Sequence, residues 1–241
     1  MIEKGKENSR GQKRFRVLNV SLNILIIAFL IALAIYYFIS NNTANRQYAC
    51  LGLVGFSFIP FIFEWISRRQ IPNYLYFFVN IYNIFAGVWG SALSAYTTYW
   101  WFDIVIHTFM GYFAGAVGLF FLCNLDDQKK MRMISVALFC LSFSLLIEGV
   151  WELFEFAIDL IAPSMQMQGI NYVGENFPLV TDTMVDILCN FIGALVFFIH
   201  YILEKTTKRK LGIDSMIKEF SSTKRKSVVS KNNKTNLKNH E

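Results

Sequence analysis

Residues Leu145–Asp159 read LLIEGVWELFEFAID, and this stretch decides how the rest of the chain is interpreted. It places Glu148, Glu152, Glu155 and Asp159 inside a segment that is otherwise apolar enough to cross a membrane. At about 100° per residue, these acids fall on one face of a helix, with aliphatic and aromatic side chains on the other faces. Charged groups at bilayer depth are costly and usually face a protein interior or a water-filled cavity. The stretch therefore predicts a membrane helix that carries a buried acidic stripe.

The composition is that of a membrane protein. Hydrophobic residues make up 54% of the 241-residue chain and charged residues only 17%, which is not the balance of a soluble domain. Apolar runs long enough to span a bilayer recur along it, so we predict an all-α, polytopic protein in contact with lipid. The net charge of +6 suggests nucleic acid as a partner, but the basic residues flank the apolar runs and no recognition motif accompanies them. The sequence therefore argues against a nucleic-acid partner.

The apolar runs predict six transmembrane helices in one domain, residues 17–203. A basic N-terminal segment, residues 1–16, precedes this domain, and a lysine-rich tail, residues 204–241, follows it and is expected to be disordered. Pro60 should kink the second helix because proline removes a backbone donor. The six predicted spans are Val17–Ser40, Tyr48–Ile66, Leu75–Ala95, Trp101–Cys123, Met133–Ala162 and Asp182–Leu203.

The distribution of positive charge predicts the orientation of these spans. Six spans place both termini on one side of the membrane, and of the 23 Lys and Arg residues only Arg46 then lies on the other side. Because short cytoplasmic segments are rich in Lys and Arg, both termini are predicted to be cytoplasmic. Glu64, near the inner end of the second span, is expected to pair with Arg68 one helical turn later.

In this topology, three helices bring acids and one imidazole to the outer half of the membrane. Asp103 and His107 lie four residues apart at the start of the fourth span, hence on one face. Asp182, Asp186 and Asn190 lie on one face at the start of the sixth span. The acidic stripe of the fifth span occupies the same level. Convergence from three separate segments predicts a site between spans four, five and six.

The chemistry of this site is predicted to involve a neutralising partner. No Lys or Arg lies between Arg69 and Lys129 or between Arg132 and Lys205. Clustered carboxylates cannot all stay ionised in a low-dielectric site, so shared protons, a divalent metal ion (Zn, Mn, Mg or Ca) or a cationic ligand must neutralise part of the charge. The candidate metal ligands are Asp103, His107, Glu148, Glu152, Glu155, Asp182 and Asp186, and the candidate catalytic residues are Glu148, Glu152, His107 and Asp103.

Structural interpretations of the same residues stay open. Thr183 and Asp186 fit a helix capping box, and Glu155 and Asp159 fit the outer membrane interface. His200, near the inner end of the sixth span, has no evident partner in the sequence. The isolated cysteines fit apolar packing, and a disulfide between Cys50 and Cys189 would require both to lie near the outer face.

Three functional classes fit the predicted site. In a metal-dependent envelope enzyme, a carboxylate acts as general base on a metal-bound water. In a proton- or cation-coupled transporter, the same carboxylates relay protons or bind the cation. In a structural or accessory protein, the acids only cap and pack helices. The inner halves of these spans are nearly all apolar, which disfavours a path across the membrane.

Several of these motifs match a known family. The chain resembles an uncharacterised family of bacterial inner-membrane proteins, the YjdF type, over residues 96–200. The matching elements are Asp103-x-x-x-His107 with Gly111, Glu148-x-x-x-Glu152-x-x-Glu155, Gln168-Gly169, Asp182-x-x-x-Asp186 and Gly193-Ala194. The stretch INYVGENFPLV after Gln168-Gly169 departs from the pattern because it lacks an aspartate and a tryptophan.

The resemblance implies a multi-pass protein of the bacterial cytoplasmic membrane without an established activity. The chain is more loosely similar to VanZ-like membrane proteins, which share a D-x-x-x-H motif, an intramembrane Glu and a D-x-x-x-N-x-x-G motif. That likeness implies an accessory role in envelope stress or antibiotic tolerance.

Overall fold

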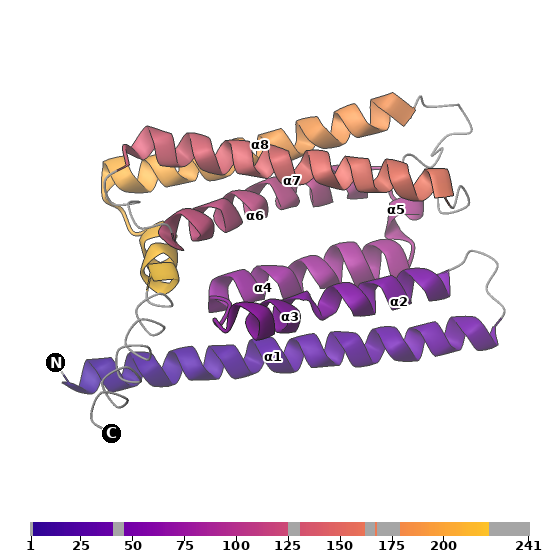
Figure 1. Ribbon diagram of the computed structural model, residues 1–241, viewed down its shortest axis with the longest axis horizontal. Helices are drawn as coiled ribbons and strands as arrows, with labels where there is room; N and C mark the ends of the chain where they lie inside the picture. Colours follow the sequence, from indigo (N-terminus) through magenta and orange to yellow (C-terminus); the bar gives the residue numbers. More distant parts are fainter. Residues whose placement is uncertain (1, 41–45, 125–130, 162–166, 168–178, 222–241) are drawn as a thin grey trace, which may run out of the picture.

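The computed structural model describes residues 2–40, 46–124, 131–161, 167 and 179–221 (Figure 1). Over these residues every regular element is helical and no strand is present, so the predicted all-α class is confirmed. The elements are α1 (Ile2–Ile39), α2 (Arg46–Ser57), α3 (Ile59–Ser67), α4 (Asn73–Tyr82), the π-helix η1 (Asn83–Ala92), α5 (Ala95–Thr98), α6 (Phe102–Asn124), α7 (Met133–Ile161), α8 (Leu179–Thr207) and a helix over residues 213–221.

Five helical stretches are long and apolar enough to cross a membrane, namely Gly11–Ile39, Arg46–Ser67, Phe102–Asn124, Met133–Ile161 and Thr181–Thr207. The second is interrupted at Phe58, and Pro60 stands in the first turn of α3, where its missing N–H needs no helical partner. The predicted third span, Leu75–Ala95, differs from the others. It is formed by α4 and η1, two ten-residue helices that follow each other directly.

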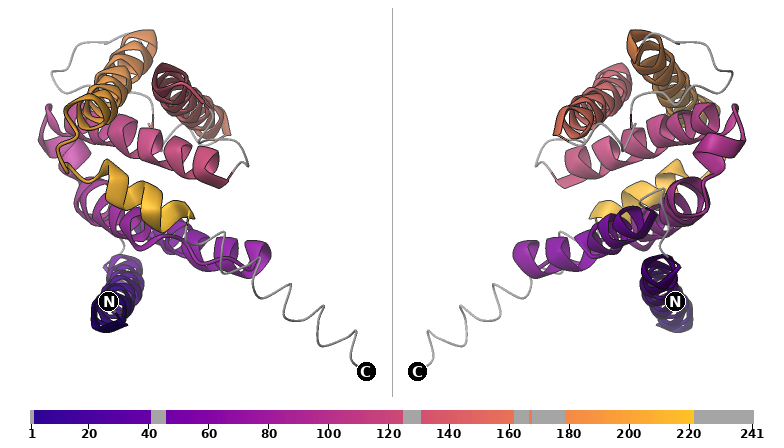
Figure 2. Two further views of the ribbon diagram at one scale, coloured as in Figure 1. Left: turned by 90° about the vertical axis from the view of Figure 1, so that its left-hand side faces the viewer. Right: turned by 90° about the vertical axis from the view of Figure 1, so that its right-hand side faces the viewer.

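The helices form two groups that lie side by side. Successive long helices run back and forth along the long axis, with α1 to α4 in one group and α6 to α8 in the other (Figures 1 and 2). The first group packs around apolar residues such as Leu30 and Cys50. The second packs around residues such as Leu119, Ala137 and Phe197. The site predicted from the sequence falls within the second group.

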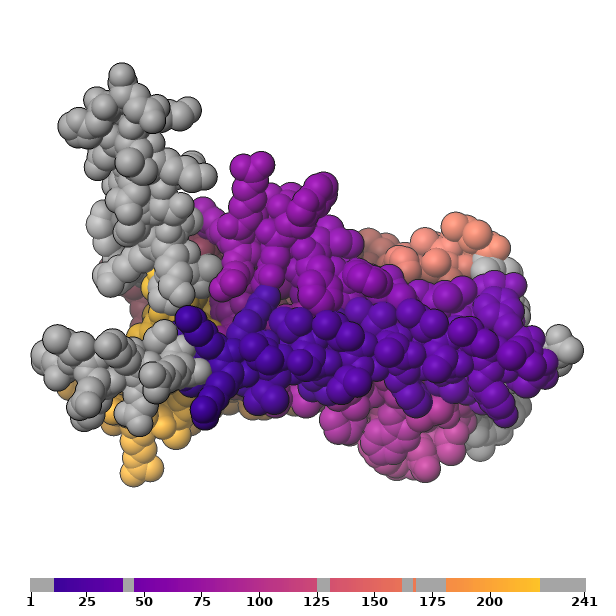
Figure 3. All heavy atoms as spheres, turned by 90° about the horizontal axis from the view of Figure 1, so that it is seen from below, coloured from indigo at the N-terminus to yellow at the C-terminus, as the bar shows by residue number. Residues whose placement is uncertain are grey.

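The outer surface of the bundle is apolar, as expected of helices that face lipid. Leu25, Tyr36 and Ile39 of α1 are among many exposed large hydrophobic side chains. Figure 3 shows α1 lying across one face of the molecule, with the purple helices of the first group beside it. An apolar surface of this extent is unfavourable in water and favourable against hydrocarbon chains.

Two glycines let α6 and α8 cross in close contact. A Cβ atom added to Gly193 of α8 would lie 1.8 Å from the Thr108 carbonyl oxygen, and one added to Gly111 of α6 would lie 2.0 Å from the Asn190 carbonyl oxygen. Both obstacles are backbone atoms, which cannot rotate away. Small residues at such crossings are how membrane helices approach each other closely.

Replacing Gly193 by alanine is therefore expected to force α6 and α8 apart and to destabilise the protein by about 3 kcal/mol, the upper range for overpacking. Gly149→Ala is the matched control, because a Cβ at Gly149 meets nothing within 4 Å. That change should be neutral or stabilising by up to about 1 kcal/mol, since alanine is the better helix former. Thermal unfolding of the detergent-solubilised variants measures both effects. Equal melting temperatures would contradict the close crossing.

The C-terminal part differs from the disordered tail predicted to begin at Glu204. α8 continues to Thr207, and the following helix buries Ile213 and Phe220 completely against the second group. The Glu204 carboxylate is buried and accepts hydrogen bonds from the backbone N–H groups of Leu211, Ile213 and Asp214 at 2.8–3.0 Å. This carboxylate therefore holds the start of the last helix on the end of α8.

Two smaller expectations are also decided by the structure. Glu64 does not pair with Arg68: its carboxylate bonds the Arg16 guanidinium at 2.5 Å and accepts the Ile71 N–H at 2.7 Å. Arg16 lies 48 positions away in the sequence, so local spacing could not reveal it. All four cysteines are buried and free, so Cys50 and Cys189 do not form a disulfide.

Candidate functional site

A cluster of acids and one imidazole is buried where α6, α7 and α8 meet. His107 comes from α6, Glu148 and Glu152 from α7, and Asp186 from α8, and all four side chains are buried. Asp103 lies one turn before His107 and is about a quarter exposed. The structure thus brings these predicted site residues together from three helices.

Carboxylates approach both nitrogens of the His107 imidazole. The Nδ1 atom lies 2.5 Å from Glu148 Oε1. The Nε2 atom lies 3.4 Å from Asp103 Oδ1 and 3.9 Å from Asp186 Oδ2. An ionised carboxylate can only accept a hydrogen bond, so the contact with Glu148 places the proton of a neutral imidazole on Nδ1. In that neutral tautomer the lone pair of Nε2 faces Asp103 and Asp186, whereas in an imidazolium an Nε2–H faces them.

Glu148 is the most enclosed acid of the cluster, with only 1% of its surface exposed. Its second oxygen, Oε2, accepts a hydrogen bond from the Asn190 side-chain amide at 2.8 Å. The Asn190 Oδ1 atom lies 3.0 Å from the Ser144 hydroxyl, which also lies 2.9 Å from the Gly111 carbonyl oxygen. Glu148 is thus held at both oxygens. Ser144 was not predicted, because a serine in an apolar helix has no distinctive spacing.

Glu152 lies one turn beyond Glu148, but no hydrogen bond in the described part of the chain joins it to this network. It is 5% exposed, and neither carboxylate oxygen has a hydrogen-bond partner among the described residues, although the Thr183 side chain lies nearby. A buried carboxylate without partners is strongly unfavourable if it is ionised. Such a group indicates that a bound ligand or a proton neutralises the carboxylate.

Two sets of side chains have ligand atoms close enough to share a metal ion. One set is Asp103, His107 and Asp186, and the other is His107, Glu148 and Glu152, with atoms within 4.8 Å of one another in each. Glu155 is buried one turn beyond Glu152. Within the described part of the chain, neither Glu155 nor Asp182 belongs to either of these two sets. Asp159 lies further along α7, where it accepts a hydrogen bond from the Met167 N–H at 2.8 Å.

The alternative interpretation of Asp186 as a capping residue is wrong. α8 begins at Leu179, so Thr183 and Asp186 stand inside the helix and not at its first turn. Asp182 does lie in the first turn, where an acid favours the positive end of a helix dipole. Asp186 is therefore free to face His107, while a structural role fits Asp182.

A second polar contact between α6 and α8, nearer the end of α8, was not predicted from the sequence. The Tyr112 hydroxyl lies 2.8 Å from His200 Nδ1, and His200 Nε2 lies 3.8 Å from the Glu204 carboxylate. His200 is thus partnered, contrary to its interpretation as an isolated residue. The i and i+4 spacing of His200 and Glu204 was the signal that could have revealed the pair.

Comparison with known families identifies the class of protein. Residues 22–206 match the model of a family described as predicted membrane protein (DUF2238). The chain belongs to this family. The YjdF type is part of it, so the resemblance seen over residues 96–200 is confirmed and extends into the first helices. The likeness to VanZ is not shown.

Membership in this DUF2238 family establishes a membrane protein with several apolar helices. No curated protein and no solved structure is detectably similar to the chain. The chemistry of the site must therefore be argued from its own residues.

Proposed function

We propose that this protein is a metal-dependent enzyme of the bacterial cytoplasmic membrane, with a divalent cation held by Asp103, His107 and Asp186. Its site opens to the outer side of the membrane. The observation that carries the proposal is the geometry of His107, whose Nδ1 atom is engaged by Glu148 while Nε2 faces two aspartates. Metal-binding histidines commonly donate their other ring N–H to a carboxylate, which fixes the tautomer and the ring orientation.

The ligand set favours zinc or manganese. One imidazole nitrogen with two carboxylates suits these ions, whereas calcium and magnesium take mainly oxygen ligands. Glu148 then orients the imidazole and is not a ligand, because its two oxygens already contact His107 and Asn190. Glu155 and Asp182 lie outside the proposed coordination sphere. The proposed metal ligands are therefore fewer than the seven candidates predicted from the sequence.

Glu152 is assigned the role of general base. It is buried beside His107 without a hydrogen-bond partner among the described residues, so its carboxylate is available to accept a proton. A divalent cation held by Asp103, His107 and Asp186 would make a bound water more acidic, and the Glu152 carboxylate would accept the proton of that water. This chemistry suits hydrolysis, in which the water adds to an electrophilic centre and the proton is passed on to the leaving group.

The transporter alternative is weaker than the enzyme. The contacts that start at His107 pass through Glu148, Asn190 and Ser144 and end at the carbonyl oxygen of Gly111. Further inward, α6, α7 and α8 pack mainly through apolar side chains such as Leu119 and Ala137. The Tyr112–His200–Glu204 contacts also lie there, but no hydrogen bond among the described residues joins them to the contacts of Glu148. A site with access from one side suits an enzyme, whereas transport needs access from both sides.

Metal analysis tests the proposal directly. Purified wild-type protein is expected to hold about one zinc or manganese ion, and Asp186→Asn should lose it. Asp159→Asn is the matched control, because Asp159 lies on α7 outside both metal-binding sets. The measurement is elemental analysis together with thermal stability in chelator and in added metal. The proposal would be wrong if the wild-type protein held no stoichiometric metal and its thermal stability changed with neither chelator nor added metal. Shared protons would then explain how the buried carboxylates are neutralised.

The orientation on which the outer location rests is part of this proposal. We place α4 and η1 together as a sixth span, since they follow each other directly as one apolar stretch and lie alongside the other helices of the first group (Figure 1). Both termini then lie on the cytoplasmic side, in agreement with the distribution of Lys and Arg.

Reporter fusions test this orientation. Fusions after Ser40, Ala95 and Leu179 are expected to report outside, and fusions after Arg69, Gln128 and Glu204 inside. The reason is the concentration of basic residues on the side of the termini. An outside signal after Glu204 would overturn the assigned depth of the acid cluster.

A further inference from the structure

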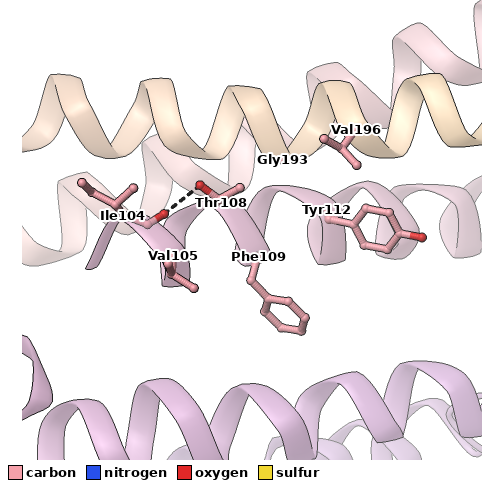
Figure 4. Close-up of a pocket in the computed structure, with 7 residues that line it drawn as sticks. All are labelled: Ile104, Val105, Thr108, Phe109, Tyr112, Gly193 and Val196. Atoms are coloured by element: carbon pink, nitrogen blue, oxygen red, sulfur yellow. Dashed lines mark hydrogen bonds between the residues drawn. The ribbon is translucent and has the colours of Figure 1, made fainter. Parts of the chain in front are cut away.

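An apolar groove runs along α6 beside its crossing with α8. It has a volume of about 360 Å³ and is lined by Ile104, Val105, Thr108, Phe109, Tyr112, Gly193 and Val196. Figure 4 shows Val105 and Phe109 pointing away from α8, while Thr108 and Val196 lie near the crossing of α6 with α8. Its volume is in the range of pockets that hold small molecules.

The lining leaves no polar group to bind a polar ligand. The Thr108 hydroxyl donates to the Ile104 carbonyl oxygen at 2.7 Å, and the Tyr112 hydroxyl is engaged with His200 at 2.8 Å. The remaining lining residues are apolar or glycine. An occupant is therefore selected by hydrophobic contact alone. Membrane-spanning helices are surrounded by the hydrocarbon chains of lipids, which are apolar and therefore fit this groove.

The groove lies at the depth of the acid cluster. Ile104 follows Asp103 directly in the sequence, and Thr108 follows His107, so the groove begins at the level of the proposed metal ligands. From Ile104 to Tyr112 it extends about 12 Å toward the inner side, at 1.5 Å per residue. A chain lying in it would hold its polar end at the outer end of α6, beside the partly exposed Asp103.

We infer that this groove binds the hydrocarbon chain of a membrane lipid and that the polar head of this lipid is the substrate of the site. The second part rests on the proposed enzymatic function, whereas the first rests only on the groove. Access along the membrane plane also explains how a bundle that is apolar on its outside receives a substrate at bilayer depth.

The groove can be tested by photo-crosslinking with a phospholipid that carries a diazirine in its acyl chain. Wild-type protein in nanodiscs is expected to be labelled preferentially on the groove side of α6 and α8, as mapped by mass spectrometry. Val196→Trp should abolish this labelling by filling the groove, and Val105→Trp should do the same from α6. Val150→Trp is the matched control, because Val150 of α7 is 56% exposed, close to the 51% of Val196, but lies outside the groove.

The outcomes separate this inference from the proposed function. Unchanged labelling in both groove variants, or even labelling of all lipid-facing helices in the wild type, would overturn the lipid site. Metal content is measured on the same samples and should be unaffected by Val196→Trp. Preferential labelling of the groove in a protein that holds no metal would support the lipid site and overturn the metal-dependent enzyme.

Discussion

Replacing Glu148 by glutamine is expected to weaken metal binding about 10- to 100-fold while the protein still folds and inserts, the usual cost of losing a residue that orients a metal-bound histidine. Glutamine keeps the shape of the side chain and can still accept the His107 Nδ1–H. Its amide then faces the Asn190 amide, and a flip of Asn190 restores that hydrogen bond because Ser144 can donate or accept. The negative charge is lost, and with it the increased basicity of the imidazole. Chelator competition on the purified variant measures the affinity.

Leucine at position 148 gives the complementary result. It removes a buried acid but leaves the His107 Nδ1–H and the Asn190 amide without acceptors, at a cost of about 1–3 kcal/mol each. The variant should therefore be less stable than the wild type. If Glu148 only packed against its neighbours, the leucine variant would be equally stable or more stable. Glu64→Gln in α3 serves as the control for metal binding, because Glu64 lies outside the acid cluster. Wild-type metal affinity in both Glu148 variants would show that Glu148 does not orient a metal-binding His107.

The burial of the acidic stripe could be predicted because helix geometry is local. The spacing of Glu148, Glu152 and Glu155 fixes their common face whatever the neighbours are, and all three are buried. Asp159, the fourth acid of the predicted stripe, is only half-buried. The i and i+4 spacing of Asp103 and His107 likewise brings those side chains together. Hydrophobic run length predicted the bounds of the later long helices to within a few residues, since an apolar span must cover the bilayer. The first helix differs, because α1 begins at Ile2 and includes most of the basic segment that was predicted to precede it.

The partners of each side chain could not be predicted, because they depend on how the helices rotate against one another. Whether His107 meets Glu148 or Glu152 is decided by the packing of α6 against α7. Its approach to Asp186 depends on the α6–α8 crossing, which the backbone contacts at Gly111 and Gly193 set. The π-helix η1 has no simple sequence period that would indicate it. The last helix was hidden by the lysine-rich composition around it, although Ile213, Met216 and Phe220 have helical spacing.

Replacing Glu152 by methionine is expected to stabilise the metal-free protein and to abolish its function. The carboxylate is buried and neither of its oxygens has a hydrogen-bond partner over the described part of the chain, so its removal relieves a desolvation cost. A gain of about 1–3 kcal/mol corresponds to a melting temperature higher by about 2–4 °C per kcal/mol in a protein of this size. Glu152→Gln should gain less, because a polar amide stays buried.

An increase in stability together with a loss of function distinguishes a functional residue from a residue that only packs at this position. Metal affinity should survive in Glu152→Met, since Asp103, His107 and Asp186 are unchanged, whereas complementation of a chromosomal deletion should fail because the general base is missing. The paired measurements are thermal unfolding without metal and growth of the complemented deletion strain. A lower melting temperature would show that Glu152 has stabilising partners after all. Full complementation would remove Glu152 from the proposed mechanism and leave the cation, held by three ligands, without its base.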